Sequence, residues 1–230
     1  MSCNSIDPIS PSKLRSDLYS FTCHDHQEPT VPLVISVLAS LVERTIARNE
    51  RLIAKCGEAV APPKDARRRA FDSCRVLDMT IQSFLERIFR YAQVSPPVYV
   101  VAYVYIDRLC RYSDAAGLRV TSTNVHRLLA TSIMVASKFL EDMNYRNSYY
   151  AKVGGLSTSE MNSLEVNFLF LIGFKLNVSV CVFESYCSHL EREVSVGGGY
   201  QIERCMRFYL CGGERERREL LNQLARIPLN

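Results

Sequence analysis

Four potential metal ligands stand together near the start of the chain, in the run Cys23-His24-Asp25-His26. Zinc sites use such ligand types, but they need four of them held at tetrahedral spacing by a folded framework. No partner pair at zinc spacing accompanies the run, and the surrounding segment is polar. We therefore interpret it as ordinary polar sequence and expect neither a metal nor a cofactor.

The sequence lacks the common catalytic signatures. It contains no Gly-x-Ser-x-Gly, no His-Glu-x-x-His, and neither the phosphate-binding nor the dinucleotide-binding glycine pattern. Its glycines cluster in loops that no strand pattern precedes. We expect a protein that is not an enzyme and has no small-molecule substrate.

Two basic runs, Arg67-Arg68-Arg69 and Arg215 to Arg218, are candidates for phosphate contact or nuclear import. Acidic residues such as Asp65 and Glu216 stand beside or within them, and no aromatic residues are interleaved. The net charge of +4 is also too small to argue for nucleic acid by itself. A solvated helix face explains both runs, and no nucleic-acid partner is expected.

Length and composition favour one domain with flanking arms. The chain has 230 residues, of which 47% are hydrophobic, and its mean hydropathy is −0.03. No apolar run approaches membrane-spanning length, and the N-terminus has no secretory pattern. We expect no membrane partner and a location in the nucleus and cytoplasm.

The nine cysteines are an odd number without a Cys-x-x-Cys, so we expect free thiols, with Cys110, Cys181 and Cys187 filling the core.

The elements that would position a site are helices, since apolar residues recur at helical spacing and no stretch alternates with period two for long. Residues 1–30 lack this pattern and are expected to form a disordered arm. A helix is predicted over 31–56, outside the main domain, followed by a linker over 57–73. The predicted fold class is all-α.

The main domain is predicted to contain five helices. They cover residues 81–92, 96–109, 124–140, 157–172 and 180–192. The second and third should be central, because one has a wide apolar face and the other carries small residues that allow close approach. Ser157 and Glu160 form a capping box at the start of the fourth helix. Residues 144–155 are predicted to be a tyrosine-rich connection.

Three segments, taken in order inside this helical pattern, resemble the cyclin box. They are Val101-Ala-Tyr-Val-Tyr-Ile-Asp107-Arg108, Ala136-Ser-Lys138-Phe139-Leu-Glu141-Asp142 and Leu164-Glu165-Val-Asn-Phe-Leu-Phe-Leu-Ile-Gly173-Phe174. The segment from Asn144 to Gly155 is similar to the plant P-type (U-type) cyclins, which resemble the yeast cyclin of the phosphate-response pathway. The resemblance implies a single five-helix cyclin box over 74–192 with an N-terminal helix, and a C-terminal extension with a short helical tail over 193–230.

The resemblance also implies a function. Cyclins bind a cyclin-dependent protein kinase and activate it by positioning its C-helix, in cell-cycle control or phosphate signalling. The chief contacts would be Lys138 and Glu165, although Lys138 could equally be a surface lysine paired with an acid one turn later. The surrounding kinase-binding surface would include residues that could also be core: Phe139, Glu141, Leu169, Phe183 and Tyr186. The alternative is a cyclin-fold interaction module in transcription that binds protein or nucleic acid without a kinase.

The sequence departs from cell-cycle cyclins in the helix that docks substrates. Counting back from Asp107 places Asp78 where an arginine would pair with that aspartate, and Leu77, Ile81 and Phe84 on the possible docking face. Asp78 is then interpreted as a helix N-cap. A buried carboxylate needs a partner, so a structural ion pair between Asp107 and Arg87 is predicted.

Overall fold

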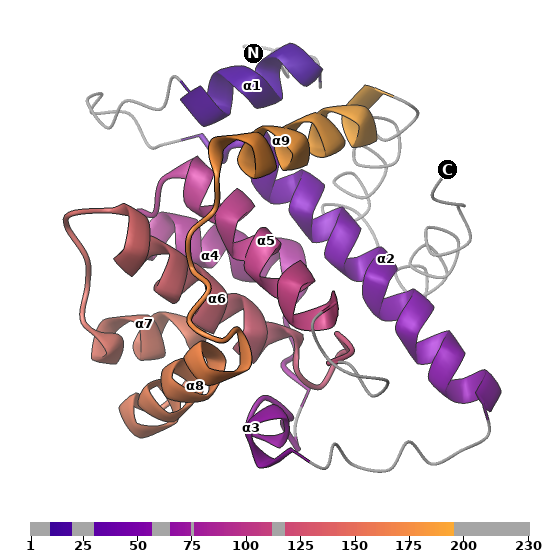
Figure 1. Cartoon of the computed structure of the whole chain (residues 1–230), viewed down its shortest axis with the longest axis vertical. Coiled ribbons are helices and arrows are strands. Elements are labelled where there is room, and N and C mark those ends of the chain that lie inside the picture. The colour runs from indigo at the N-terminus through magenta and orange to yellow at the C-terminus, as the bar shows by residue number, and fades with distance from the viewer. Residues whose placement is uncertain (1–9, 20–29, 57–64, 75, 112–117, 196–230) are drawn as a thin grey trace, which may run out of the picture.

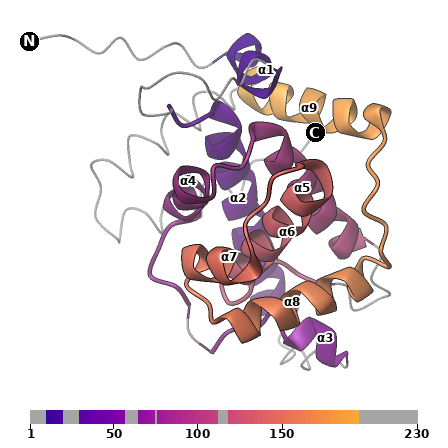
Figure 2. The same ribbon diagram turned by 90° about the vertical axis from the view of Figure 1, so that its left-hand side faces the viewer.

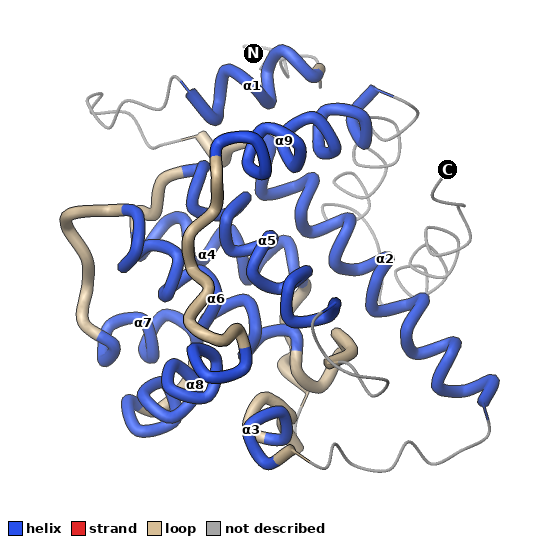
Figure 3. The backbone as a smooth tube through the Cα atoms, in the orientation of Figure 1, coloured by secondary structure: helices blue, strands red, loops and turns tan. Residues whose placement is uncertain are grey.

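The computed structural model describes residues 10–19, 30–56, 65–74, 76–111 and 118–195. Within these ranges the chain forms helices and no strand (Figures 1 and 3), so the all-α prediction is confirmed. The helices are α1 Pro11–Tyr19, α2 Leu33–Cys56, α3 Ala66–Arg69, α4 Ile81–Ala92, α5 Pro96–Arg111, α6 Val125–Leu140, α7 Asn147–Gly154, α8 Thr158–Leu171 and α9 Val180–Ser195. None of them combines the length and the apolarity that a membrane span requires.

Helices α5 and α6 form the centre of the molecule, as the sequence predicts (Figure 2). They pack against each other, with α2 and α9 beside α5 and with α4, α7 and α8 beside α6. Every residue of α6 from 128 to 137 is buried. Small side chains make this possible, and Gly154 of α7 lies so close that an added Cβ would stand 3.3 Å from the Cβ of Ala130.

Helix α2 belongs to the packed body, and the prediction that it lies outside the main domain is wrong. Its residues 33–43 are all buried, and it packs against α4, α5 and α9. Figure 1 shows it running diagonally along one side of the other helices. Burying so many apolar side chains needs neighbours on several sides, which a detached helix would not have.

Part of the predicted disordered arm is also ordered. Leu14 and Leu18, one helical turn apart in α1, are buried against α2, α5 and α9. Asp17 Oδ2 accepts a hydrogen bond from the amide of Leu33 at 2.6 Å, and Arg15 Nε donates to Glu191 Oε1 at 2.6 Å. Residues 1–9 and 20–29, and with them the run from Cys23 to His26, lie outside the described residues.

The predicted linker over 57–73 ends in ordered structure. Asp65 caps α3, and Phe71 is fully buried with its ring edge-on to that of Phe168, 6.4 Å away. Arg127 Nη1 donates to the carbonyl oxygen of Ala70 at 3.1 Å. The chain from 65 onward is therefore held on α6 and α8 before the predicted box begins.

The predicted tyrosine-rich connection contains a helix, α7, which ends at Gly155 with a φ of 70°. Tyr150, Ala151 and Val153 of this helix are buried. The capping box between Ser157 and Glu160 is confirmed at the start of α8.

At the end of the predicted box, α9 continues to Ser195. The rest of the predicted C-terminal extension, 196–230, lies outside the described residues, with the run Arg215 to Arg218 in it. Of the three cysteines expected in the core, Cys187 is buried and Cys110 is half-buried, but Cys181 is exposed.

Candidate functional site

Lys138 and Glu165 form an ion pair, although 27 residues separate them in the sequence. Lys138 Nζ lies 2.7 Å from Glu165 Oε1, and the two side chains are 32% and 20% exposed. Lys138 stands in the last turn of α6, where the partial negative charge of a helix C-terminus favours a cation. Glu165 lies on α8, which packs against α6, so the structure brings together the two residues that the sequence singles out.

Two asparagines complete a polar cluster around the pair. Asn147, the first residue of α7, accepts a hydrogen bond from Lys138 Nζ through Oδ1. Its Nδ2 donates to Glu165 Oε2 at 2.6 Å and to Asn162 Oδ1 at 2.8 Å. The cluster therefore joins α6, α7 and α8. Sequence reasoning missed Asn147, because it placed this position in a loop.

The cluster keeps unused hydrogen-bonding capacity. A lysine ammonium has three donors, and two of those of Lys138 are taken by Glu165 and Asn147. A carboxylate has about four acceptor positions, and Glu165 accepts from Lys138 on Oε1 and from Asn147 on Oε2. The site can thus offer one donor and further acceptors side by side, which suits a segment of protein backbone that presents both carbonyl oxygens and amides.

Exposed apolar side chains lie in the same elements. On α6 and the segment after it, Phe139 is 48% exposed, Leu140 47% and Met143 90%. On α8, Val166 is 53% exposed, while Leu169 is half-buried against the core. Apolar side chains around a charged pair are typical of a protein-binding surface.

Glu141 is engaged inside the molecule. Its Oε1 accepts from the amide of Ser95 at 3.0 Å, just before α5, and its Oε2 accepts from Ser137 Oγ at 2.6 Å. Oε1 therefore ties the end of α6 to the start of α5, Oε2 is held by α6 itself, and Glu141 serves the fold.

Phe183 and Tyr186 lie on α9, and both are half-buried against the core. The hydroxyl of Tyr186 donates to Asp107 Oδ2 on α5. Burial, followed by the hydrogen bond to Asp107, raises the pKa of Tyr186. Tyr186 thus holds α9 onto α5.

The predicted ion pair between Asp107 and Arg87 is wrong. Asp107 Oδ2 lies 2.8 Å from Arg111 Nε, one turn later on the same helix, and also accepts from Tyr186. Arg87 is exposed on α4. Partners on α5 and α9 satisfy the carboxylate, so α4 has no need to supply one.

The possible docking face is not open. Ile81 is 6% exposed and Phe84 is 1% exposed, with the Phe84 ring edge-on to His126 at 4.9 Å. Helix α2 packs against α4, and only Leu77 of the three predicted residues is exposed, at 40%. Asp78 is not the N-cap, because Thr80 caps α4 by accepting from the amide of Ser83. These residues therefore belong mainly to the core.

An exposed aromatic pair follows Glu165 in the chain. Phe174 has a φ of 57°, is 58% exposed, and meets Phe170 edge-on at 5.3 Å. Gly173 before it also has a positive φ, of 62°. Sequence reasoning placed Gly173 and Phe174 in the third cyclin-box segment and did not predict that the Phe174 ring is exposed.

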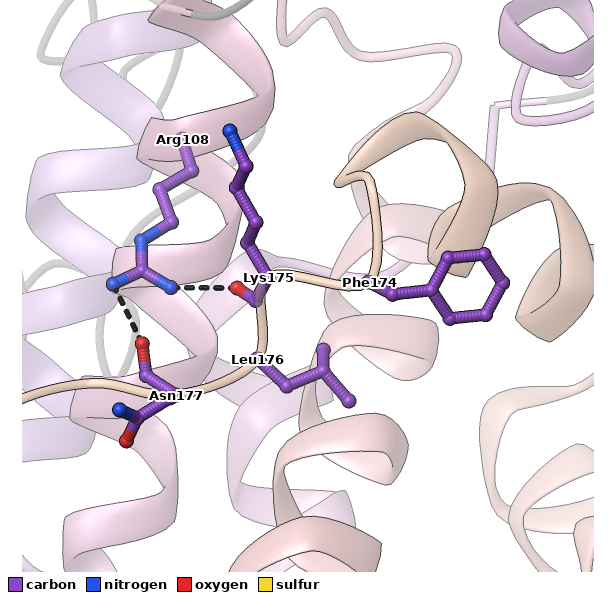
Figure 4. Close-up of a pocket in the computed structure, with 5 residues that line it drawn as sticks. All are labelled: Arg108, Phe174, Lys175, Leu176 and Asn177. Carbon is purple, nitrogen blue, oxygen red and sulfur yellow. Dashed lines mark hydrogen bonds between the residues drawn. The ribbon is translucent and has the colours of Figure 1, made fainter.

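A hollow of about 350 Å³ lies beside this turn, lined by Arg108, Phe174, Lys175, Leu176 and Asn177 (Figure 4). Arg108 donates from Nη1 to the carbonyl oxygen of Lys175 at 2.7 Å and from Nη2 to that of Asn177 at 3.1 Å. Figure 4 shows the Phe174 ring pointing away from the guanidinium. Arg108 therefore fixes the loop that presents Phe174.

In the described ranges no group of three or more His, Cys, Asp and Glu could hold a metal ion.

Known proteins match this chain along most of its length. The family model described as Cyclin matches residues 33–176, from the first residue of α2 to the loop after α8. Cyclin-U2-1 of Arabidopsis thaliana is 60% identical over 213 residues, which cover 93% of this chain and 90% of that protein. Cyclin-P2-1 of Oryza sativa subsp. japonica is 59% identical over 210 residues, or 90% of this chain and 94% of that protein.

Proposed function

Since this chain belongs to the cyclin family, we propose that it binds and activates a cyclin-dependent protein kinase, and that Lys138 and Glu165 hold the C-helix of that kinase. The observation that carries the proposal is the ion pair itself, at 2.7 Å, at the surface and beside exposed apolar side chains. A regulatory rather than a catalytic role agrees with the family.

The proposed mechanism is a shift of population. An active kinase needs the ion pair between its ATP-positioning lysine and the glutamate of its C-helix. A protein that binds the inward position of that helix more tightly than the outward one raises the population of the active state by its difference in affinity. Glu165 can accept from the unpaired backbone amides in the first turn of that helix, and Lys138 can donate to backbone carbonyl oxygens in the segment just before it.

The proposed contact surface differs from the predicted one. It keeps Phe139 and Leu169 from the prediction and adds Phe174, whose exposed ring follows the same helix as Glu165. It leaves out Glu141 and Tyr186, whose polar atoms are already engaged within the chain. It also leaves out Phe183, which lies on α9, a helix that packs against α1, α2 and α5. The proposal includes action in cell-cycle control or phosphate signalling, in the nucleus and cytoplasm.

Exchanging the two charges tests the proposal. The double variant Lys138→Glu, Glu165→Lys can keep an internal ion pair, so the fold should persist, but donor and acceptor change places. We expect binding to a panel of purified plant cyclin-dependent kinases to fall by a factor of about 100 or more, as truncating buried charge pairs does. Surface plasmon resonance would measure it, with activation of the bound kinase as the second readout.

The matched control exchanges Arg15 and Glu191, an ion pair of 2.6 Å between α1 and α9. The variant Arg15→Glu, Glu191→Arg should bind the kinase as the unmodified chain does. Undiminished kinase binding by the Lys138/Glu165 exchange would refute the proposed interface.

A further inference from the structure

Asn147 is placed to control both members of the ion pair at once. Its side-chain amide contacts Lys138 through the oxygen and Glu165 through the nitrogen, the latter at 2.6 Å. It comes from a third helix, α7, so its position does not depend on the packing of α6 against α8 alone.

The orientation of the amide is determined by its neighbours. An ammonium can only donate and a carboxylate can only accept, so the oxygen of Asn147 must face Lys138 and the nitrogen must face Glu165. The second proton of Nδ2 goes to Asn162 Oδ1 at 2.8 Å, which braces the amide from α8. Both ends of the amide are thus used, and a rotation by 180° would make its contacts with Lys138 and Glu165 repulsive.

Such an arrangement lowers the cost of binding. Lysine and glutamate side chains are long, and ordering each of them at an interface lowers affinity. Hydrogen bonds to Asn147 restrict both side chains before a partner arrives. We infer that Asn147 is a positioning residue that holds Lys138 and Glu165 in the geometry the kinase binds, an inference that rests on the proposed function.

The first test replaces the amide. Asn147→Ala removes all three contacts, and we expect it to weaken binding to the purified plant cyclin-dependent kinases about tenfold. Asn147→Asp keeps an acceptor for Lys138 but replaces the donor to Glu165 by a negative charge, so its loss should be at least as large. Aspartate in the first turn of a helix is favourable, so this second variant keeps α7 even where alanine weakens it.

The matched control is Asn167→Ala. Asn167 lies on α8, two residues beyond Glu165, and its amide donates to Ser163 Oγ at 3.3 Å, one turn earlier on the same helix. The same substitution there should leave kinase affinity unchanged.

A double-mutant cycle separates positioning from direct contact. If Asn147 acts through the pair, Asn147→Ala should weaken kinase binding much less in a Glu165→Gln background, by about threefold or below. An equal loss in both backgrounds would mean that Asn147 acts independently of the pair, and it would overturn the inference.

The remaining outcomes distinguish the inference from the proposed function. Unchanged affinity of Asn147→Ala and Asn147→Asp, together with loss of binding in the Lys138/Glu165 exchange, would refute the role of Asn147 and leave the interface in place. Retention of the kinase by the exchange variant would refute the interface and the inference together.

Discussion

At the scale of single residues, Asp107 shows how unequal two contacts of one carboxylate can be. Its partner Arg111 lies one turn later on α5 and is 76% exposed, so this ion pair should contribute only a few tenths of a kcal/mol. The hydroxyl of Tyr186 reaches Asp107 from α9, across 79 residues of sequence. A half-buried hydrogen bond to a charged acceptor, made between two helices, should contribute more.

Removing that hydroxyl should lower stability without affecting the proposed function. We expect Tyr186→Phe to reduce the free energy of unfolding by about 1–3 kcal/mol, because the bond to a charged group is lost. Urea denaturation followed by circular dichroism would measure the change. Kinase affinity should be unaltered, because the hydroxyl of Tyr186 is engaged within the chain.

Two controls accompany this prediction. Arg111→Ala should cost less than about 0.5 kcal/mol, as exposed ion pairs do, and Arg87→Ala should have no effect, since Arg87 does not reach Asp107. A larger loss of unfolding free energy from Arg87→Ala than from Tyr186→Phe would contradict the assignment of Arg111 and Tyr186 as the partners of Asp107.

At the scale of elements, long helices were predictable and short ones were not. Apolar residues at helical spacing are numerous enough to predict α4, α5, α6, α8 and α9. The capping box of Ser157 and Glu160 marks the start of α8. Helix α1 spans nine residues and offers only Leu14 and Leu18. Isolated helices of that length are marginal, so their existence depends on distant surfaces, here α2 and α9, that local sequence does not display.

The site follows the same rule. Lys138 and Glu165 could be predicted because they stand in recognisable motifs on long helices. The role of Asn147 could not, because it depends on α7, and the exposure of Phe174 depends on a left-handed turn fixed by Arg108. The predicted partner of Asp107 was wrong because the packing of α9 against α5, which brings Tyr186 to the carboxylate, is not visible in local sequence.

If α1 depends on its docking, a core substitution in it should destabilise the whole domain. Leu18 is 3% exposed, and we expect Leu18→Ala to lower the free energy of unfolding by about 2–4 kcal/mol. Ser16→Ala, at an exposed position of the same helix, should change it by less than about 0.5 kcal/mol. Equal stability of the two variants in urea would mean that α1 does not contribute to the cooperative core.

At the scale of the whole molecule, the ion pairs that join α1 and α2 to α9 lie away from the proposed binding surface. Figure 1 shows α1 and α9 at one end, whereas α7 and α8 lie at the other. Arg15 with Glu191, and Arg44 with Glu193, join α1 and α2 to α9. The ends of the described chain therefore hold each other, and the cluster of Lys138, Asn147 and Glu165 stays available to a partner.

Two tyrosines of α5 should make the stability of the whole fold depend on pH in the alkaline range. Burial raises the pKa of Tyr103 and of Tyr105 to about 12, whereas tyrosine in an unfolded chain has a pKa of about 10. Between these values the unfolded state has lost protons that the native state keeps. Native stability is therefore complete below a pH of about 10 and declines as pH rises toward 12, by about 1.4 kcal/mol per pH unit for each such tyrosine.

Tyr103→Phe isolates one of these protons. The ring of Tyr103 packs edge-on against Tyr186 at 6.0 Å, and phenylalanine can keep that contact. We expect the variant to show a slope of unfolding free energy against pH that is shallower by about 1.4 kcal/mol per pH unit between roughly pH 10 and 12. Urea titrations at several pH values would give both slopes. Identical slopes would mean that Tyr103 ionises in the native state as readily as in the unfolded chain, and that the packing of α5 against α2 and α9 admits water at this position.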